Sequence, residues 1–201
     1  MTGRFSARCI EVCFDALFRE ALRTTLRGGA PEPLYLPAGD GHPAQIRYRA
    51  DFLASALHEV AHWCVAGTAR RQLTDYGYWY AAEGRDLAAQ RAFERVELRP
   101  QAIEGLFAEV LRVPFRVSLD NPGRSDCDPA AFTEAVAAEM GRLRQTGLPP
   151  RARRFRAALA SLAATRAAPV SVPGRVAERG LVQADDATDS GVTQSCCASG
   201  C

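Results

Sequence analysis

Residues 52–67 read FLASALHEVAHWCVAG, and their apolar side chains recur at the three- and four-residue spacing of an amphipathic helix. Asp51 is the predicted N-cap of this helix, and Gly67 is its predicted stop signal. His58 and His62 are four residues apart and therefore share one face of the helix. Because apolar residues surround both imidazoles, we expect this helix to lie in the core of the fold.

The two histidines belong to an HExxH pattern, in which both imidazoles can reach one metal ion while Glu59 projects to the side. Burying these three side chains without partners would cost several kcal/mol, and a bound metal ion removes that cost. The remaining histidine, His42, lies in a loop rich in Pro and Gly and is the weaker ligand. The sequence therefore predicts a metal site on this helix, of the kind found in metallopeptidases.

A third ligand is needed, and catalytic sites often combine two histidines with one carboxylate, as in zinc hydrolases and non-haem Fe(II) oxygenases. The candidate carboxylates are Glu94 and Glu97, and their spacing does not separate them. The chain has no His-x-Asp pair, so it shows no signature of 2-oxoglutarate oxygenases with ligands on strands. It also has no second Glu-x-x-His motif to pair with residues 59–62 in a di-iron site. The remaining prediction is a mononuclear site.

Other segments show both helical and strand patterns without regular βαβ alternation, which favours an α+β fold. Further helices are expected at residues 6–26 (ended by Gly28 and Gly29), 86–95 (capped by Asp86), 100–111, 129–145 and 151–165. Strands are expected at residues 34–36, 45–49, 75–80 and 115–119. We therefore predict a single domain in which helices flank a small sheet.

The composition is that of one ordinary globular domain. Of the 201 residues, 47% are hydrophobic and 24% are charged, and the net charge of +2 does not indicate nucleic-acid binding. No apolar run approaches the roughly 18 residues of a membrane span, and the N-terminus lacks the apolar run of a secretory signal. We expect a cytoplasmic protein with a metal-binding domain at residues 1–167. Residues 168–201 are rich in small and polar residues, and we expect a disordered tail there.

Several motifs together are more specific than HExxH alone. They are HEVAHWCVAG at residues 58–67, DYGYWY at 75–80, VELRPQA at 96–102 and PFRVSLDN at 114–121. With them the chain resembles the bacterial elongation factor P hydroxylases, continuously from about residue 32 to about residue 155. The resemblance implies hydroxylation of a lysine of elongation factor P whose side chain is already extended by a β-lysyl group.

The resemblance also implies a ligand set and a co-substrate. In that family two histidines and one glutamate hold iron, and the matching positions here are His58, His62 and Glu97, which favours Glu97 over Glu94. The implied cofactor is Fe(II) with O2 as co-substrate, although the same ligands also accept zinc. Glu59 is then a catalytic-site residue outside the ligand set, which orders a water molecule or orients the site.

The implied partner is elongation factor P itself, without direct contact to nucleic acid or membrane. Its modified lysine is cationic, and we expect Asp75, Asp120 or Glu94 to receive the ammonium group. Two hypotheses from other classes remain open. One is an HExxH zinc metallopeptidase with Glu59 as the general base. The other is a catalytically silent binding protein with a structural metal.

Overall fold

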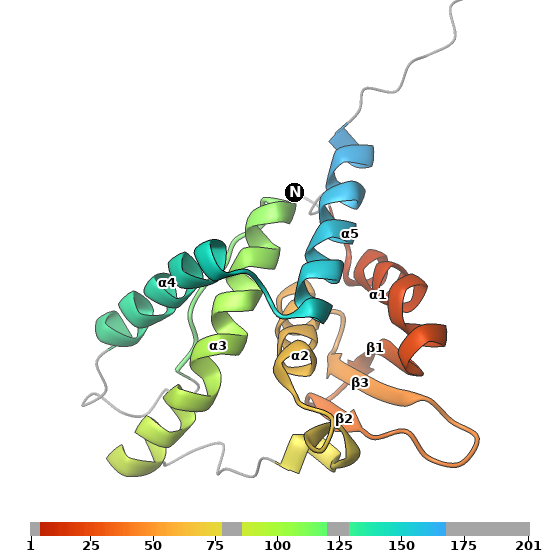
Figure 1. Ribbon diagram of the computed structural model, residues 1–201, viewed down its shortest axis with the longest axis horizontal. Coiled ribbons are helices and arrows are strands. Elements are labelled where there is room, and N and C mark those ends of the chain that lie inside the picture. The colour runs from red at the N-terminus through yellow and green to blue at the C-terminus, as the bar shows by residue number, and fades with distance from the viewer. Residues whose placement is uncertain (1–4, 78–85, 120–128, 168–201) are drawn as a thin grey trace, which may run out of the picture. The chain divides into compact units, whose positions relative to one another are not determined.

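The computed structural model describes residues 5–77, 86–119 and 129–167, and the histidine pair lies on its helix α2 (Leu53–Val65). Figure 1 shows α2 between the long helix α3 (Leu87–Leu111) on one side and helix α1 (Ala7–Leu22) with a small sheet on the other. Helix α5 (Pro150–Ala167) contacts α1, α2 and α3, and α4 (Pro129–Thr146) packs on α3. The HExxH helix is therefore central among the described elements.

The sheet contains strands β1 (Thr24–Ala30), β2 (Leu34–Leu36) and β3 (Ala44–Arg49), in the order β1-β3-β2. Strand β1 pairs with β3 in parallel, and β2 pairs with β3 in antiparallel fashion, so that Tyr35 lies opposite Ile46. Leu26, Tyr35 and Ile46 are buried, and α2 contacts both β1 and β3. The sheet thus supports one side of α2.

The face of α2 that points away from His58 is held by an aromatic cluster. The Trp63 ring lies 4.9 Å from that of Phe18 and 5.1 Å from that of Phe14, which in turn lies 5.9 Å from Phe155 of α5. Aromatic side chains supply much of a core's buried area and prefer such tilted and edge-on contacts. The cluster therefore fixes how α2 is rotated relative to α1 and α5.

Arg151 of α5 caps the C-terminal end of α2. Its guanidinium donates to the carbonyl oxygens of Trp63 (2.9 Å), Cys64 (3.2 Å) and Ala66, and it lies 4.8 Å from the centre of the Trp63 ring. The last carbonyls of a helix lack partners within the helix, and a cation there also interacts favourably with the helix dipole. Arg151 therefore stabilises the turn that carries His62.

Most predicted elements are confirmed. The fold is α+β with a three-stranded sheet, the described residues fall within one compact unit, and the helices at 129–145 and 151–165 and the strands at 34–36 and 45–49 are present to within two residues. Asp86 caps α3 as predicted, since its side chain accepts from the amide of Ala89 at 2.8 Å. The predicted tail at residues 168–201 lies outside the described residues.

The strand predicted at residues 75–80 is wrong over its described part. Residues Thr74–Gly77 form a 3-10 turn in which Asp75 (φ 48°) and Tyr76 (φ 59°) have left-handed backbones, while residues 78–80 lie outside the described ranges. The aromatic composition predicted a strand. The Tyr76 ring instead stacks on Tyr35 of β2, with 4.3 Å between ring centres. Side-chain packing therefore determines the conformation of this segment.

The strand predicted at residues 115–119 is also wrong, because this segment makes no strand pairing in the described structure. The Ser118 amide donates to Oε1 of Gln101 at 3.0 Å, and the Ser118 carbonyl accepts from Nε2 of Gln101 at 2.7 Å. A glutamine side chain thus takes the place of a neighbouring strand and ties the segment to α3.

Three helix boundaries also differ from prediction. Asp51 is not the N-cap of α2, since Phe52 holds that position without a side-chain hydrogen bond. The first helix ends at Leu22, where Arg23 is left-handed, and Gly28 and Gly29 lie inside β1 instead. The helices expected at 86–95 and 100–111 form one helix, α3, with Pro100 in its interior. Proline removes one helical hydrogen bond, and the packing of α3 against α2, α4 and α5 outweighs that loss.

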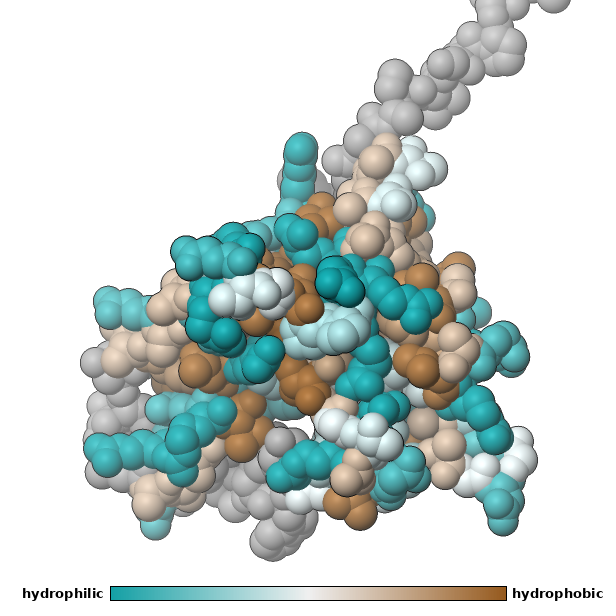
Figure 2. Space-filling model, in the orientation of Figure 1, coloured by the Kyte–Doolittle hydropathy of each residue, from teal (hydrophilic) through white to brown (hydrophobic). Residues whose placement is uncertain are grey.

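Apolar side chains on the surface are dispersed. The large exposed ones among the described residues are Val12 and Leu22, both on α1, and Phe52 and Leu73, which lie on two other segments. On the face shown in Figure 2, apolar residues are scattered between polar ones. None of the described helices is long and apolar enough to cross a membrane.

Glu11 ties α1 to the sheet through a buried carboxylate. Its Oε1 accepts from the Gly28 amide at 2.8 Å and from the Tyr48 hydroxyl at 3.0 Å, and its Oε2 pairs with Arg8. Burial alone would raise the pKa of Glu11, but the Gly28 amide, Arg8 and Tyr48 outweigh it and lower the pKa. The ionised carboxylate is therefore a stabilising link between three elements.

Replacing Glu11 should destabilise the fold measurably. We expect Glu11→Ala to lower the free energy of unfolding by about 1–3 kcal/mol, since it leaves buried donors without an acceptor. Glu20→Ala on the exposed side of the same helix should change it little. Because the folded-state pKa is lowered, the stabilisation is complete at neutral pH and decreases as the pH falls below about 4.3. Urea titrations at several pH values measure this, and equal losses in both variants would contradict the assignment.

Candidate metal centre

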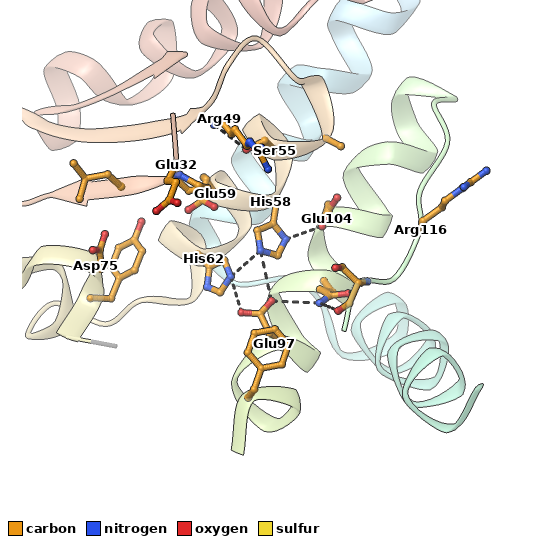
Figure 3. A pocket seen from close by; sticks show the side chains of 17 residues that line it. Glu32, Arg49, Ser55, His58, Glu59, His62, Asp75, Glu97, Glu104 and Arg116 are labelled. Atoms are coloured by element: carbon orange, nitrogen blue, oxygen red, sulfur yellow. Dashed lines mark hydrogen bonds and ion pairs between the residues drawn. The ribbon is translucent and has the colours of Figure 1, made fainter. Parts of the chain in front are cut away.

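Three side chains from two helices converge beside a cavity (Figure 3). His62 Nε2 lies 3.1 Å from Glu97 Oε1, His58 Nε2 lies 3.5 Å from Glu97 Oε2, and the two Nε2 atoms are 3.1 Å apart. One nitrogen from each histidine and a carboxylate oxygen all lie within 4.8 Å of one another, so this group could hold a metal ion. The structure thus brings together the three residues that the sequence suggested as ligands.

Helix geometry explains this convergence. The i, i+4 spacing puts both imidazoles on the face of α2 that meets α3. On α3 the buried polar side chains are Gln90, Glu97, Gln101 and Glu104. The last three follow each other at i, i+4 and i+7, so they form one polar stripe along an otherwise apolar helix face. The packing of α2 on α3 therefore sets this stripe against the histidine pair.

Glu94 lies apart from this arrangement. It is only half-buried, accepts a hydrogen bond from Gln90 at 3.3 Å and does not line the cavity, whereas Glu97 is 2% exposed. The geometry therefore separates the two carboxylates that the sequence spacing left equal. His42 does not line the cavity either, and Asp120 lies outside the described residues.

Glu104 is a site residue that the sequence analysis missed. Its Oε2 lies 2.8 Å from Nδ1 of His58, the distance of a hydrogen bond. A carboxylate on one ring nitrogen of a histidine fixes the ring's orientation and tautomer and makes the other nitrogen a better ligand. Glu104 therefore directs Nε2 of His58 toward Glu97. The signal was present in the sequence as the seven-residue spacing between Glu97 and Glu104 on one helix.

Gln101 was missed as well. Its Nε2 lies 3.4 Å from Glu97 Oε2 and also donates to the carbonyl oxygen of Ser118 at 2.7 Å. The side chain therefore joins the carboxylate to the segment at residues 113–119, which passes the cavity. It holds one oxygen of Glu97 in place and leaves the other directed at His62.

The electrostatics of the cluster favour a bound cation. Burial would lower the pKa of His58, but the hydrogen bond to Glu104 and the charges of Glu97, Glu104 and Glu59 raise it to about 10. Burial would likewise raise the pKa of Glu97, but His62, His58 and Gln101 lower it to about 2. Without a metal ion, a proton on His58 thus balances the neighbouring carboxylates. A divalent cation can take over that role, because two imidazoles and a carboxylate suit iron and zinc.

The cavity has a volume of about 690 Å³. Its wall contains the carboxylates of Glu32, Glu59, Asp75, Glu97 and Glu104 and the guanidinium groups of Arg49 and Arg116. Glu59 lies next to the histidine pair but outside the group of possible metal ligands. The arrangement provides three converging donor atoms beside a cavity large enough for a long side chain.

Comparison with known proteins agrees with these features. Residues 13–171 match the family model described as Elongation factor P hydroxylase. A curated relative, the Elongation factor P lysine hydroxylase of Haemophilus influenzae, is 42% identical over 153 residues, which cover 76% of this chain and 86% of the relative. The chain therefore belongs to the elongation factor P hydroxylase family, and the resemblance stated from its sequence motifs is confirmed.

Glu104 provides a test of this centre that is independent of activity. We expect Glu104→Ala to weaken the binding of Zn(II) about 10- to 100-fold, because His58 loses the partner that orients it. Glu109→Ala is the matched control on the same helix, since Glu109 is exposed and pairs only with Arg144 among the contacts described. Competition with a chromogenic chelator measures both affinities. Equal affinities in the two variants would contradict the role of Glu104.

Proposed function

We propose that this protein is an iron-dependent lysine hydroxylase of elongation factor P. The observation that carries the proposal is the convergence of His58, His62 and Glu97 beside a cavity in a member of this family. The relative from Haemophilus influenzae is named as a lysine hydroxylase of the same substrate. Following the sequence motifs, we further propose that the target lysine carries a β-lysyl group when it is hydroxylated.

We assign the metal to Fe(II), held by His58, His62 and Glu97. Two imidazoles and one carboxylate are the ligand set of many non-haem Fe(II) oxygenases, and three protein ligands leave coordination positions free. When bound, Fe(II) supplies the chemistry with O2 that hydroxylation of an unactivated carbon requires. Overall, a C–H bond becomes C–OH with one oxygen atom of O2, and the other leaves as water with two protons and two electrons from an external donor.

The side chains around the centre have separate roles in this proposal. Glu104 orients His58, and Gln101 holds Glu97. Phe93, which is buried on the cavity wall, restricts water near the reacting carbon. Glu59 belongs to the catalytic site without being a metal ligand. We assign the activity to a domain at residues 1–167, and place the protein in the cytoplasm because its proposed substrate is a translation factor.

Hydroxylation can be measured directly on the substrate. Elongation factor P that carries its β-lysyl group and is co-expressed with this protein should gain the mass of one oxygen atom. We expect His62→Ala and Glu97→Gln to abolish the gain and the iron content, because each removes a ligand. Glu94→Gln, three residues from Glu97 on the same helix, should keep both.

Two outcomes of this experiment would overturn the proposal. An unchanged mass with iron bound and the substrate confirmed as β-lysylated would contradict hydroxylation. If the partner nevertheless bound, the result would support a silent binding protein with a structural metal. Full activity in Glu97→Gln would contradict the ligand assignment while leaving the substrate assignment intact.

The family match does not support the zinc peptidase alternative, and Glu59 distinguishes the two activities. In a peptidase with this motif the glutamate is the general base, so its loss abolishes turnover. In the proposed hydroxylase Glu59 is no ligand, so we expect Glu59→Gln to retain iron and a reduced but measurable activity. Intact-mass time courses give the rate, and metal analysis gives the iron content. Complete loss of turnover with iron retained would argue for the general base.

A further inference from the structure

One end of the cavity is lined by three carboxylates. Figure 3 shows Glu32, Glu59 and Asp75 on one side of the histidine pair, and Glu104 and Arg116 on the other. Glu59 is half-buried and, within the described residues, makes no hydrogen bond or ion pair. Burying a carboxylate is costly unless it is paired, so this end of the cavity favours a further cationic group that can pair with Glu59 directly.

Tyr76 adds an independent observation. Its side chain is only 4% exposed and lines the cavity, yet its hydroxyl has no hydrogen-bond partner among the described residues. The ring is held in place by stacking on Tyr35, whose own hydroxyl donates to the Arg71 carbonyl at 2.9 Å. Glu59 and Asp75 line the same cavity as the Tyr76 side chain. A buried polar group without a partner is rare, and this one belongs to a cavity that two carboxylates also line.

Asp75 is held on the cavity wall by a strained backbone. Both Asp75 and Tyr76 have left-handed backbones, which cost free energy in residues other than glycine. Asp75 Oδ1 accepts from the Tyr35 amide at 2.7 Å, and Arg70 donates to the Tyr76 carbonyl at 2.8 Å. Oδ2 of Asp75 has no partner within the described ranges. The strain thus positions one carboxylate oxygen and one hydroxyl together on the cavity wall.

The three groups match one kind of ligand. Glu59 and Asp75 line the same side of the cavity, and like charges in one cavity are less unfavourable when a cation binds there. An ammonium group has three N–H donors and no acceptor, and two carboxylate oxygens and a hydroxyl oxygen can each accept one of them. Arg116 lies on the other side of the histidine pair in Figure 3, where it repels an ammonium, and the exposed Arg49 makes no ion pair with Glu59 among the described residues.

We propose that Glu59, Asp75 and Tyr76 bind the terminal ammonium of the lysine side chain on which the enzyme acts. This inference rests on the proposed function, since it takes the substrate to be a modified lysine. Glu59 directly follows the ligand residue His58 on α2, so a side chain anchored at its ammonium passes the metal centre. Recognition of the charge would then set which carbon faces the centre.

Binding without O2 tests this separately from hydroxylation. The probes are elongation factor P with its β-lysyl group and the same protein with an isosteric acyl group in which hydroxyls replace the amines. We expect Asp75→Asn, which keeps an acceptor for the Tyr35 amide, to weaken binding of the charged probe to the iron-loaded enzyme about 10- to 100-fold. The neutral probe should bind Asp75→Asn and the wild type equally, and Glu94→Gln should change neither affinity.

Tyr76→Phe separates a binding role from a structural one. Removing a buried hydroxyl that has no partner should leave the melting temperature unchanged or raise it. We expect the same change to weaken binding of the charged probe about threefold to tenfold. A lowered melting temperature with unchanged affinity would show that Tyr76 only supports the fold.

Several results would overturn the inference whatever the outcome for hydroxylation. Equal weakening of both probes by Asp75→Asn would show that charge is not recognised there. A second equivalent of metal in the wild type, lost in Asp75→Asn, would assign this end of the cavity to a metal ion. Conversely, charge-dependent binding without any oxygen gain would retain the ammonium site and reject the proposed function.

Discussion

Helices α2 and α3 meet through buried imidazoles and carboxylates, where most helix pairs in a core meet through apolar side chains. His58 contacts both Glu97 and Glu104, and His62 contacts Glu97. Such a contact is stable only if the charges are paired and the distances are short, because unpaired buried charges are costly. The rest of the fold can be understood as the means of holding these two helices at that distance.

Packing on the faces opposite the polar contact holds α2 and α3 in place. Trp63 directly follows His62, and its ring packs against Phe14 and Phe18. Arg151 caps the same end of α2. Helix α3 stays continuous through Pro100, so Glu97 and Glu104 lie on one rigid element. Residues on rigid helices can hold a metal or substrate more reproducibly than residues on loops. The aromatic cluster thus fixes the position of α2 at which its histidines can pair with the carboxylates of α3.

Periodic patterns predicted the parts of this structure that depend on local sequence. The helix around His58, the cap at Asp86 and the family were all recognised from short motifs. The two strands predicted around Asp75 and Ser118 were wrong because contacts distant in the sequence decide these segments. Tyr76 packs on Tyr35, and the Gln101 side chain takes the place of a strand partner. Glu104 was missed because glutamates scattered along a helix usually lie on its solvent-exposed face. Only the packing of α2 on α3 shows which glutamates are buried.

The central claim is that His58, His62 and Glu97 together hold iron. Its most direct measurement is anomalous diffraction at the iron absorption edge, from crystals grown with Fe(II) in the absence of O2. The account predicts one strong peak within bonding distance of both histidine nitrogens and an oxygen of Glu97. A peak at other residues, or none at this position while iron is bound elsewhere, would contradict it.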